Sequence, residues 1–314
     1  MIHSGDRIPI RRFDDLLAAA RQRGPVRIAV AAAHDPEVLK AVSQAQAEGI
    51  VEATLVGDWP AMEAYAAGLR STQPEIGQAL SRAEIIHEPD PHQAAVKVVS
   101  MAREGQADVV VKGQVKTADL LGAALSRHVG IRGQGLLSHV GVYELPAVDR
   151  LIYLSDSGVV VYPDIAQKLA IINNVVGVAH LFGLELPKVA ILAASETVHP
   201  HIPASIDALA LAKMAEQGWV QGAIVDGPLG LEMAVSPRAA ALAEVDSPIA
   251  GLADVLIVPN VEAGNIVAKG LLYFAHARMA GLVVGARVPI IISSRADSAE
   301  TRYLSLAMAA ILAK

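Results

Sequence analysis

The chain has 314 residues, 53% of them apolar and 18% charged, so its composition excludes an intrinsically disordered protein. Its 26 basic and 32 acidic side chains give a net charge of −6 without a basic block, which argues against a nucleic-acid partner. It contains no cysteine, which excludes disulfide bonds, thiolate metal sites and a cysteinyl acyl intermediate.

The high apolar content makes a membrane span the first alternative to consider. The longest stretch without Asp, Glu, Lys or Arg, residues 169–184, contains two asparagines and a histidine and predicts a buried helix instead. The first fifteen residues include early charged side chains and lack the apolar core of a signal peptide. We therefore expect a cytoplasmic protein without a membrane partner.

Short β-branched segments alternate with Ala-rich helical segments in the first part of the chain. Strands are predicted at 26–30, 52–56, 83–87 and 108–111. Asp35 followed by Pro36 predicts a capped helix start. Further helices are expected from Pro60, from Pro91 and after Thr117, which is expected to cap its helix.

The middle of the chain departs from this alternation. Residues 140–143 and 151–154, joined through Pro146, predict an antiparallel hairpin. Strand–turn–helix units then resume, with strands at 189–193, 222–225, 255–258 and 288–292. Repeated βα units with apolar strands predict a mostly parallel sheet covered on both faces, and the length favours two α/β lobes with a cleft between them.

Polar residues gather where predicted strands end, which is where open α/β sheets bind ligands. Ser293, Ser294 and Arg295 follow the last strand and open the final helix. Hydroxyls, backbone N–H groups and a guanidinium at a helix N-terminus suit a small anion. The alternative is ordinary capping by Ser294 or Ser298, with Arg295 solvated.

Four other strand ends carry candidate residues. Lys112 and Gly113 allow a tight turn that can approach phosphate, although Lys112 could equally be a surface lysine. Neither a P-loop nor a dinucleotide fingerprint is present. The remaining candidates are Asp226, the pair His199 and His201, and the segment 259–265. The histidine pair lacks a fixed third ligand, so we expect it to be solvated rather than to hold a metal.

Seven segments together resemble one family. The chain resembles phosphate acyltransferases of the phosphate acetyltransferase/phosphate butyryltransferase family, and the order and spacing are closer to the butyryl type. The resemblance runs from about Val26 to the C-terminus. It is carried by VKGQVKT (111–117), SHVGVYELP (138–146), LSDSGVVVYPD (154–164), VAILAASETVHP (189–200), VDGPLGLEMAVSP (225–237), ADVLIVPNVEAGNIVAKGL (253–271) and VPIIISSRADSAETR (288–302).

This resemblance implies an isocitrate/isopropylmalate dehydrogenase-like fold and a homodimer. Residues 1–140 with 293–314 would form the first lobe and residues 141–292 the second. The implied reaction is acyl-CoA plus phosphate giving acyl phosphate plus CoA, with acetyl or butyryl groups, by direct displacement in a ternary complex. It implies no metal and no cofactor, because coenzyme A and inorganic phosphate are substrates.

The resemblance also implies roles for the residues around the final strand. Ser294 would orient the CoA sulfur, and Arg295 would hold phosphate and the developing oxyanion. The family's base is an aspartate shortly after this pair, which here leaves Asp297 or Glu300. Thr301 stands one position beyond Glu300.

Further residues are implied as substrate-binding. A second phosphate-side arginine is expected at Arg132, with Arg127 as the alternative. The resemblance further implies two groups that line the cleft from opposite walls: Lys112, Gly113 and Thr117 on one, and Asn260, Gly264 and Asn265 on the other.

Three other functions stay open. A related enzyme could form acyl phosphate from an acyl carrier protein, but the basic residues are scattered rather than gathered in a docking patch. A metal-dependent oxidoreductase of the same fold would need an aspartate cluster, which the sequence does not show. A non-catalytic binding protein would be expected to have lost Ser294 or Arg295, and both are present.

Overall fold

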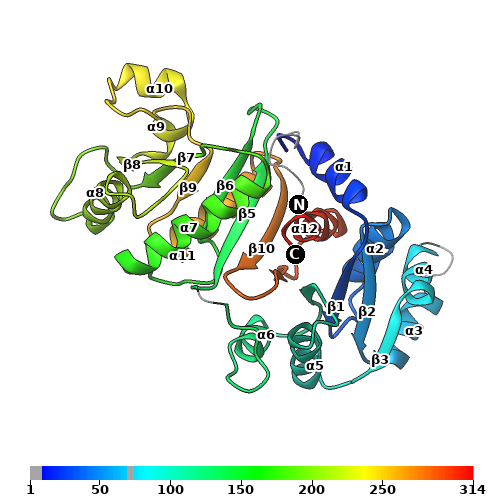
Figure 1. Cartoon of the computed structure of the whole chain (residues 1–314). Helices are drawn as coiled ribbons and strands as arrows, with labels where there is room; N and C mark the ends of the chain where they lie inside the picture. The colour runs from blue at the N-terminus through cyan, green and yellow to red at the C-terminus, as the bar shows by residue number, and fades with distance from the viewer. Residues whose placement is uncertain (1–8, 69–71, 73, 134, 314) are drawn as a thin grey trace. The chain divides into compact units, whose positions relative to one another are not determined.

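The computed structural model describes the chain except residues 1–8, 69–71, 73, 134 and 314 (Figure 1). Contacts within the chain divide it into two compact units. One comprises residues 14–135 and 280–314, and the other comprises residues 136–279 with the described N-terminal residues up to Phe13. The sequence-based lobes, 1–140 with 293–314 and 141–292, stay a prediction.

The unit of residues 14–135 and 280–314 is built on parallel strands in the order β3-β2-β1-β4-β11. β10 continues this order by pairing antiparallel with β11, through Val283 and Ile290. All four residues of β4 are buried, as expected for a central parallel strand covered on both faces. The strands are β1 (Val26–Ala31), β2 (Val51–Gly57), β3 (Glu84–His87), β4 (Val109–Lys112), β10 (Arg278–Val284) and β11 (Ile290–Ile291).

Two groups of helices pack on this sheet (Figure 1). α2 packs against α4 and α12, whereas α5 packs against β1, β2, β4 and α6. The last helix is mostly apolar after its first turn, and nine of its residues are buried. The helices are α1 (Phe13–Arg23), α2 (Pro36–Ala47), α3 (Trp59–Gly68), α4 (Pro74–Arg82), α5 (Pro91–Arg103), α6 (Thr117–Ala124) and α12 (Ala299–Leu312).

The unit of residues 136–279 has strands in the order β5-β6-β9-β7-β8, of which only β5 and β6 pair antiparallel. Its strands are β5 (Ser138–Glu144), β6 (Leu151–Ser155), β7 (Lys188–Leu192), β8 (Ile224–Leu229) and β9 (Val255–Ile257). Its helices are α7 (Ile165–Leu181), α8 (Pro203–Glu216), α9 (Leu231–Val235), α10 (Pro237–Leu242) and α11 (Val261–Tyr273). The buried core includes Tyr143, Leu154, Leu229 and Leu256.

The mixed α/β class and the mostly parallel strands are confirmed, as is the antiparallel hairpin, in which Gly141 pairs with Leu154. Asp35 caps α2 as predicted, and its side chain accepts from the N–H groups of Glu37 and Val38. The capping role predicted for Thr117 is wrong. Thr117 is the first residue of α6, and Lys116 occupies the cap position without a side-chain hydrogen bond.

Two other local features differ from the sequence-based expectation. Asp226 was expected in a turn after its strand, but residues 226–228 lie inside β8. β10 was not predicted, and it makes the sheet mixed because it runs antiparallel to β11. Among the described residues, no helix has both the length and the apolar character needed to cross a membrane.

Candidate active site

The final strand, β11, ends in a loop that is closed by its own polar groups before α12 begins. The N–H of Ser294 donates to Oδ2 of Asp297 at 2.7 Å, and the N–H of Asp297 donates back to the carbonyl of Ser294 at 3.2 Å. Ser298 then caps α12, because its Oγ accepts from the N–H of Thr301 at 3.2 Å. The loop therefore has a defined shape that presents Ser294 and Arg295.

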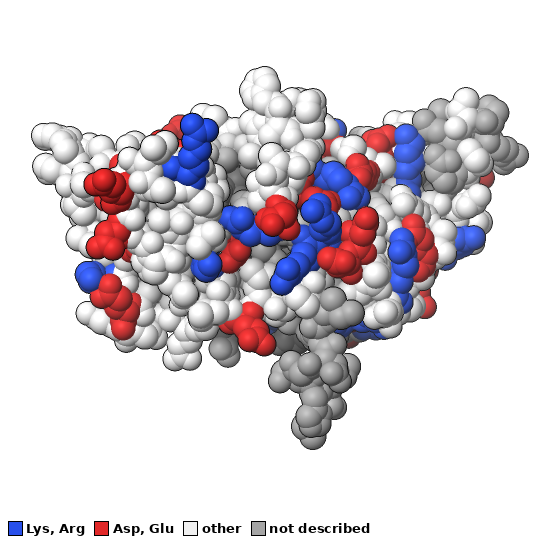
Figure 2. All heavy atoms as spheres, turned by 90° about the horizontal axis from the view of Figure 1, so that it is seen from above, with Lys and Arg blue, Asp and Glu red and all other residues white. Residues whose placement is uncertain are grey.

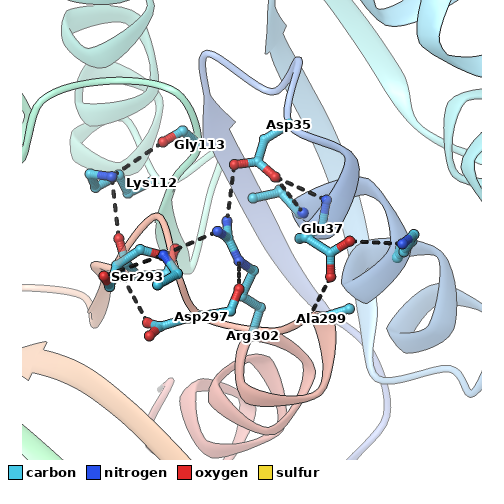
Figure 3. A network of polar contacts seen from close by, with 12 residues as sticks. Asp35, Glu37, Lys112, Gly113, Ser293, Asp297, Ala299 and Arg302 are labelled. Carbon is cyan, nitrogen blue, oxygen red and sulfur yellow. Dashed lines mark hydrogen bonds and ion pairs between the residues drawn. The ribbon is translucent and has the colours of Figure 1, made fainter. Parts of the chain in front are cut away.

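Arg302, in the first turns of α12, reaches back to this loop (Figure 3). Its Nε donates to the carbonyl of Asp297, and its Nη2 donates to the carbonyl of Ser294, both at 3.2 Å. Its Nη1 lies 3.3 Å from Oδ2 of Asp35, the cap of α2. One buried guanidinium thus joins the loop after β11 to the segment after β1.

Glu37, in the first turn of α2, makes a second link between the same two segments. Its Oε2 accepts from the N–H of Ala299 at 3.0 Å, and its Oε1 accepts from Nζ of Lys40 at 2.7 Å. The hydrogen bond from Lys40 is the main reason why the pKa of Glu37 lies below its ordinary value. The start of α12 is therefore attached to α2 at two points.

Lys112, the last residue of β4, lies between these segments and is 7% exposed. Its Nζ donates to the carbonyls of Ser293 at 3.3 Å and Gly113 at 3.4 Å (Figure 3). Burial, followed by the nearby charge of Arg302, lowers the pKa of Lys112. The turn after it requires glycine, because a Cβ on Gly113 would lie 2.3 Å from the carbonyl oxygen of Ala32.

These segments border a cavity of about 610 Å³ within the unit of residues 14–135 and 280–314. It receives four cationic side chains, three carboxylates and one histidine. The lining residues are Asp35, Asp90, Pro91, His92, Lys112, Gly113, Gln114, Val115, Lys116, Asp119, Arg295 and Arg302. Guanidinium and ammonium groups at strand ends and helix starts are suited to a small anion.

On the face drawn in Figure 2, basic and acidic side chains lie interspersed, in keeping with the net charge of −6. Attraction of an anion therefore depends on placed donors rather than on a broad positive area. Among the described residues, Arg295 makes no hydrogen bond or ion pair, and its exposed side chain lines the cavity.

The catalytic candidates lie together at the start of α12. Ser294 is exposed, and its Oγ accepts from the N–H of Ala296 at 3.4 Å, so it also shapes the loop. Asp297 is half-buried, and one of its carboxylate oxygens is held by the N–H of Ser294. Glu300 lies in the first turn of α12 and is exposed. Of these candidates, Arg295 lines the cavity.

The substrate-binding candidates of the same unit are not all brought to the cavity. Lys112 and Gly113 line it, whereas Thr117 is not among its lining residues. Arg132 is exposed, its Nε donates to the carbonyl of Leu125, and its backbone forms an isolated bridge with Ala286. The alternative arginine, Arg127, is exposed. Neither arginine lines the cavity.

The remaining candidates belong to the unit of residues 136–279, after β9. Asn260 caps α11, with its Oδ1 accepting from the N–H of Ala263 at 3.0 Å. Gly264 packs so closely that a Cβ would lie 2.7 Å from the carbonyl oxygen of Asp156. Asn265 is exposed.

Arg302, which donates to two carbonyls of the loop, was not predicted from the sequence. Its signal in the sequence was a charged residue directly before ten uncharged positions of the final helix. Asp35 was recognised as a cap only, and its second oxygen, which faces Arg302, was not anticipated.

The possible histidine metal pair does not form a larger ligand set. The rings of His199 and His201 lie 5.5 Å apart. Over the part of the chain that the structure describes, no three His, Asp or Glu side chains are grouped to hold a metal.

Comparisons with known proteins place the chain in one family. Residues 13–310 match the family described as Phosphate acetyl/butaryl transferase. A phosphate butyryltransferase of Clostridium acetobutylicum is 40% identical over 97% of this chain and 99% of its own length. A phosphate acetyltransferase of Rhizobium meliloti is 39% identical over 96% of this chain and 93% of its own.

A solved structure agrees with the sequence relatives. The branched-chain phosphotransacylase from Enterococcus faecalis V583 has a TM-score of 0.79 and 31% identity, and the match covers 92% of this chain and all of that one. Because the family match spans residues 13–310 and the relatives are matched over nearly their full length, the chain belongs to the phosphate acetyl/butyryl transferase family and is an acyltransferase.

Proposed function

We propose that this chain interconverts acyl-CoA plus phosphate and acyl phosphate plus CoA, with acetyl or butyryl as the acyl group, by direct displacement in a ternary complex. The observation that carries the proposal is Arg295, which lines a cavity together with the cationic side chains Lys112 and Lys116. A phosphate dianion is the small, charged substrate that such a set of donors suits best.

In this mechanism an oxygen of phosphate attacks the thioester carbonyl carbon. The new C–O bond forms as the C–S bond breaks, and the electron pair of that bond leaves with sulfur as the CoA thiolate. Arg295 holds the phosphate in line and stabilises the negative charge that develops on the carbonyl oxygen. The hydroxyl of Ser294 faces the departing sulfur and stabilises its charge through a hydrogen bond.

In the reverse direction the CoA thiol must lose a proton before it attacks the acyl phosphate. Asp297 and Glu300 are the carboxylates proposed to accept it. One oxygen of Asp297 is already held by the N–H of Ser294, whereas Glu300 is exposed at the start of α12. Because the N–H of Ser294 fixes Asp297 within the loop, we propose Glu300 as the base and Asp297 as a residue that shapes the loop.

The proposal extends to substrate binding. Lys112 and Gly113 would contact phosphate from the end of β4, and Thr117 and Arg132 would contribute nearby. Asn260, Gly264 and Asn265 would bind substrate from the start of α11. Two observations support these assignments. The residues lie in segments that carry the family resemblance, and the two sets follow the parallel strands β4 and β9.

We further propose that the reaction needs neither a metal nor a cofactor beyond its substrates, and that the protein is a cytoplasmic homodimer with an isocitrate/isopropylmalate dehydrogenase-like fold. These statements rest on the resemblance in the chain's own motifs. EDTA should leave turnover unchanged, and a loss of turnover that added divalent metal restores would refute metal independence.

The function is tested by following thioester loss and free-thiol release with acetyl-CoA and butyryl-CoA, with and without inorganic phosphate. Ser294→Ala and Arg295→Ala serve as the matched variants, because both residues are exposed and their removal should leave the fold intact. Phosphate-dependent thiol release that both variants lose supports the proposal. Phosphate-independent release would indicate a thioesterase instead.

A further inference from the structure

Arg302 is distinguished by its burial. It is 5% exposed, yet its guanidinium lines the cavity that Arg295 also lines. A buried guanidinium is retained only where its donors find acceptors, because an unpaired buried charge is strongly destabilising. Its three acceptors therefore indicate what the residue does.

Two of these acceptors are backbone carbonyls of a single loop. Nη2 binds the carbonyl of Ser294 and Nε binds the carbonyl of Asp297, so both ends of the segment that carries Arg295 are attached to one rigid group. A guanidinium is planar and fixes the angle between its donors, which an ammonium cannot do. The loop is thus held in orientation as well as in position.

The third acceptor ties this loop to a different part of the sheet. Oδ2 of Asp35 lies 3.3 Å from Nη1 of Arg302, while Oδ1 of Asp35 caps α2. Asp35 neutralises the buried charge and anchors it to the end of β1, two strands from β11 in the sheet order. Figure 3 shows Arg302 between Asp35 and the loop.

A second cation supports the adjacent carbonyl. Nζ of Lys112 donates to the carbonyl of Ser293 from the end of β4. The carbonyls of two consecutive residues, 293 and 294, are therefore each held by a buried cation. The side chains of Ser294 and Arg295 themselves remain exposed.

We propose that Arg302 is a positioning residue for the transfer reaction, which sets the orientation of Ser294 and Arg295 without contacting substrate itself. The inference rests on the proposed function of that pair. Misplacement of reacting groups by about 1 Å can lower the rate about 100-fold. Removal of the Arg302 side chain should therefore act mainly on kcat.

The test compares Arg302→Ala and Arg302→Lys with Arg27→Ala. Arg27 is the matched control, because it also uses three guanidinium nitrogens, toward Asp108 and the carbonyl of Gly105, and does not line the cavity. We expect Arg302→Ala to lower kcat by about 30-fold or more, with the KM for phosphate and for acyl-CoA changed by less than about threefold. Arg27→Ala should keep the wild-type kcat.

Chemical rescue separates positioning from a general loss of stability. Guanidinium chloride at about 10–50 mM is far below denaturing concentrations and should restore much of the kcat of Arg302→Ala by refilling its site, but should not increase the kcat of Arg27→Ala. If Arg302→Ala does not fold, the kcat of Arg302→Lys tests the positioning role instead. An ammonium group cannot reproduce the planar set of guanidinium donors, so kcat should still fall.

The outcomes distinguish this inference from the proposed function. An inactive wild-type protein refutes the proposed function itself. An active wild type with unchanged kcat in folded Arg302→Lys or Arg302→Ala overturns the positioning role. A large rise in the KM for phosphate at constant kcat would also overturn it, because Arg302 would then bind substrate directly.

Discussion

Arg302 and Asp35 lie 3.3 Å apart, from Nη1 to Oδ2, although they are separated by 267 positions in the chain. The contact joins the start of α12 to the cap of α2. It can form because β11 and β1 both pair with β4, one on each side and in parallel. Their carboxyl ends therefore meet at one edge, where the cationic cavity lies.

Replacement of Arg295 should abolish most of the activity without unfolding the protein. Loss of its charge-assisted contacts to phosphate and the oxyanion should cost about 2–4 kcal/mol of transition-state stabilisation in Arg295→Ala. The side chain is exposed, so the unfolding midpoint should stay near that of the wild type. Both are measured on one preparation, by kcat/KM and by urea unfolding. Near wild-type turnover would remove Arg295 from the mechanism.

The two candidate bases can be separated by the pH dependence of kcat/KM in the direction that forms acyl-CoA. Removal of the base should abolish the fall in rate on the acid side. We expect Glu300→Gln to lose this acid limb. Asp297→Asn should keep the limb but unfold at lower urea, because Asp297 holds the N–H of Ser294. Wild-type profiles in both variants would exclude a carboxylate base in this loop.

The turn after β4 should tolerate no side chain. In Gly113→Ala the new Cβ would lie 2.3 Å from the carbonyl oxygen of Ala32 and 2.6 Å from that of Ala31, so backbone must move. We expect a loss of about 1–3 kcal/mol of unfolding free energy and reduced turnover, since Lys112 moves with the turn.

Gly122 is the matched control for this prediction. It lies in α6, where a Cβ would meet nothing within 4 Å. Gly122→Ala should stabilise the protein by about 0.5–1 kcal/mol through helix propensity. If the two alanine substitutions changed the unfolding free energy equally, the close approach at Gly113 would not contribute to stability.

Glu37 should make stability depend on acid pH. Its pKa is lowered in the folded state, first by the hydrogen bond from Lys40, so folding favours the carboxylate. This stabilisation is complete at pH values above 4.5, the ordinary pKa of a glutamate side chain. It is lost as the pH falls through the lower pKa that Glu37 has in the folded protein.

The prediction is tested by urea unfolding at a series of pH values, from neutral pH to below the ordinary glutamate pKa of 4.5. Glu37→Gln should be less stable than the wild type at neutral pH, and the difference should shrink in acid. Glu63→Gln, at an exposed position of α3, is the control and should follow the wild type throughout. A difference between Glu37→Gln and the wild type that stays constant with pH would contradict the account.

Local patterns predicted most strands and the cap of α2, which involves neighbouring residues. The alternation of apolar strands and Ala-rich helices gave the α/β class, and the Asp35-Pro36 pair gave the start of α2. Thr117 was misplaced by one position, because threonine is compatible with both the cap and the first helical position and the sequence alone does not distinguish them. β10 was missed because its pairing with β11 depends on the sheet and not on its own pattern.

The candidate site was predictable only in part. Ser294, Arg295 and Lys112 stand next to strand ends, so a positional rule identifies them. Arg302 and Asp35 acquire their relationship from the order of β1, β4 and β11, which no local pattern specifies. The charge of Arg302 before a long uncharged stretch was visible in the sequence, but its three acceptors could be identified only from the fold.

Analysis of the products tests whether Arg295 has its proposed role in the transfer of an acyl group to phosphate. Butyryl-CoA or acetyl-CoA is incubated with inorganic phosphate, and free thiol and acyl phosphate (trapped with hydroxylamine) are quantified together. If Arg295 has this role, both products form in equal amounts only when phosphate is present, and both are nearly absent with Arg295→Ala. Thiol release without acyl phosphate, or equal yields with Arg295→Ala, would contradict it.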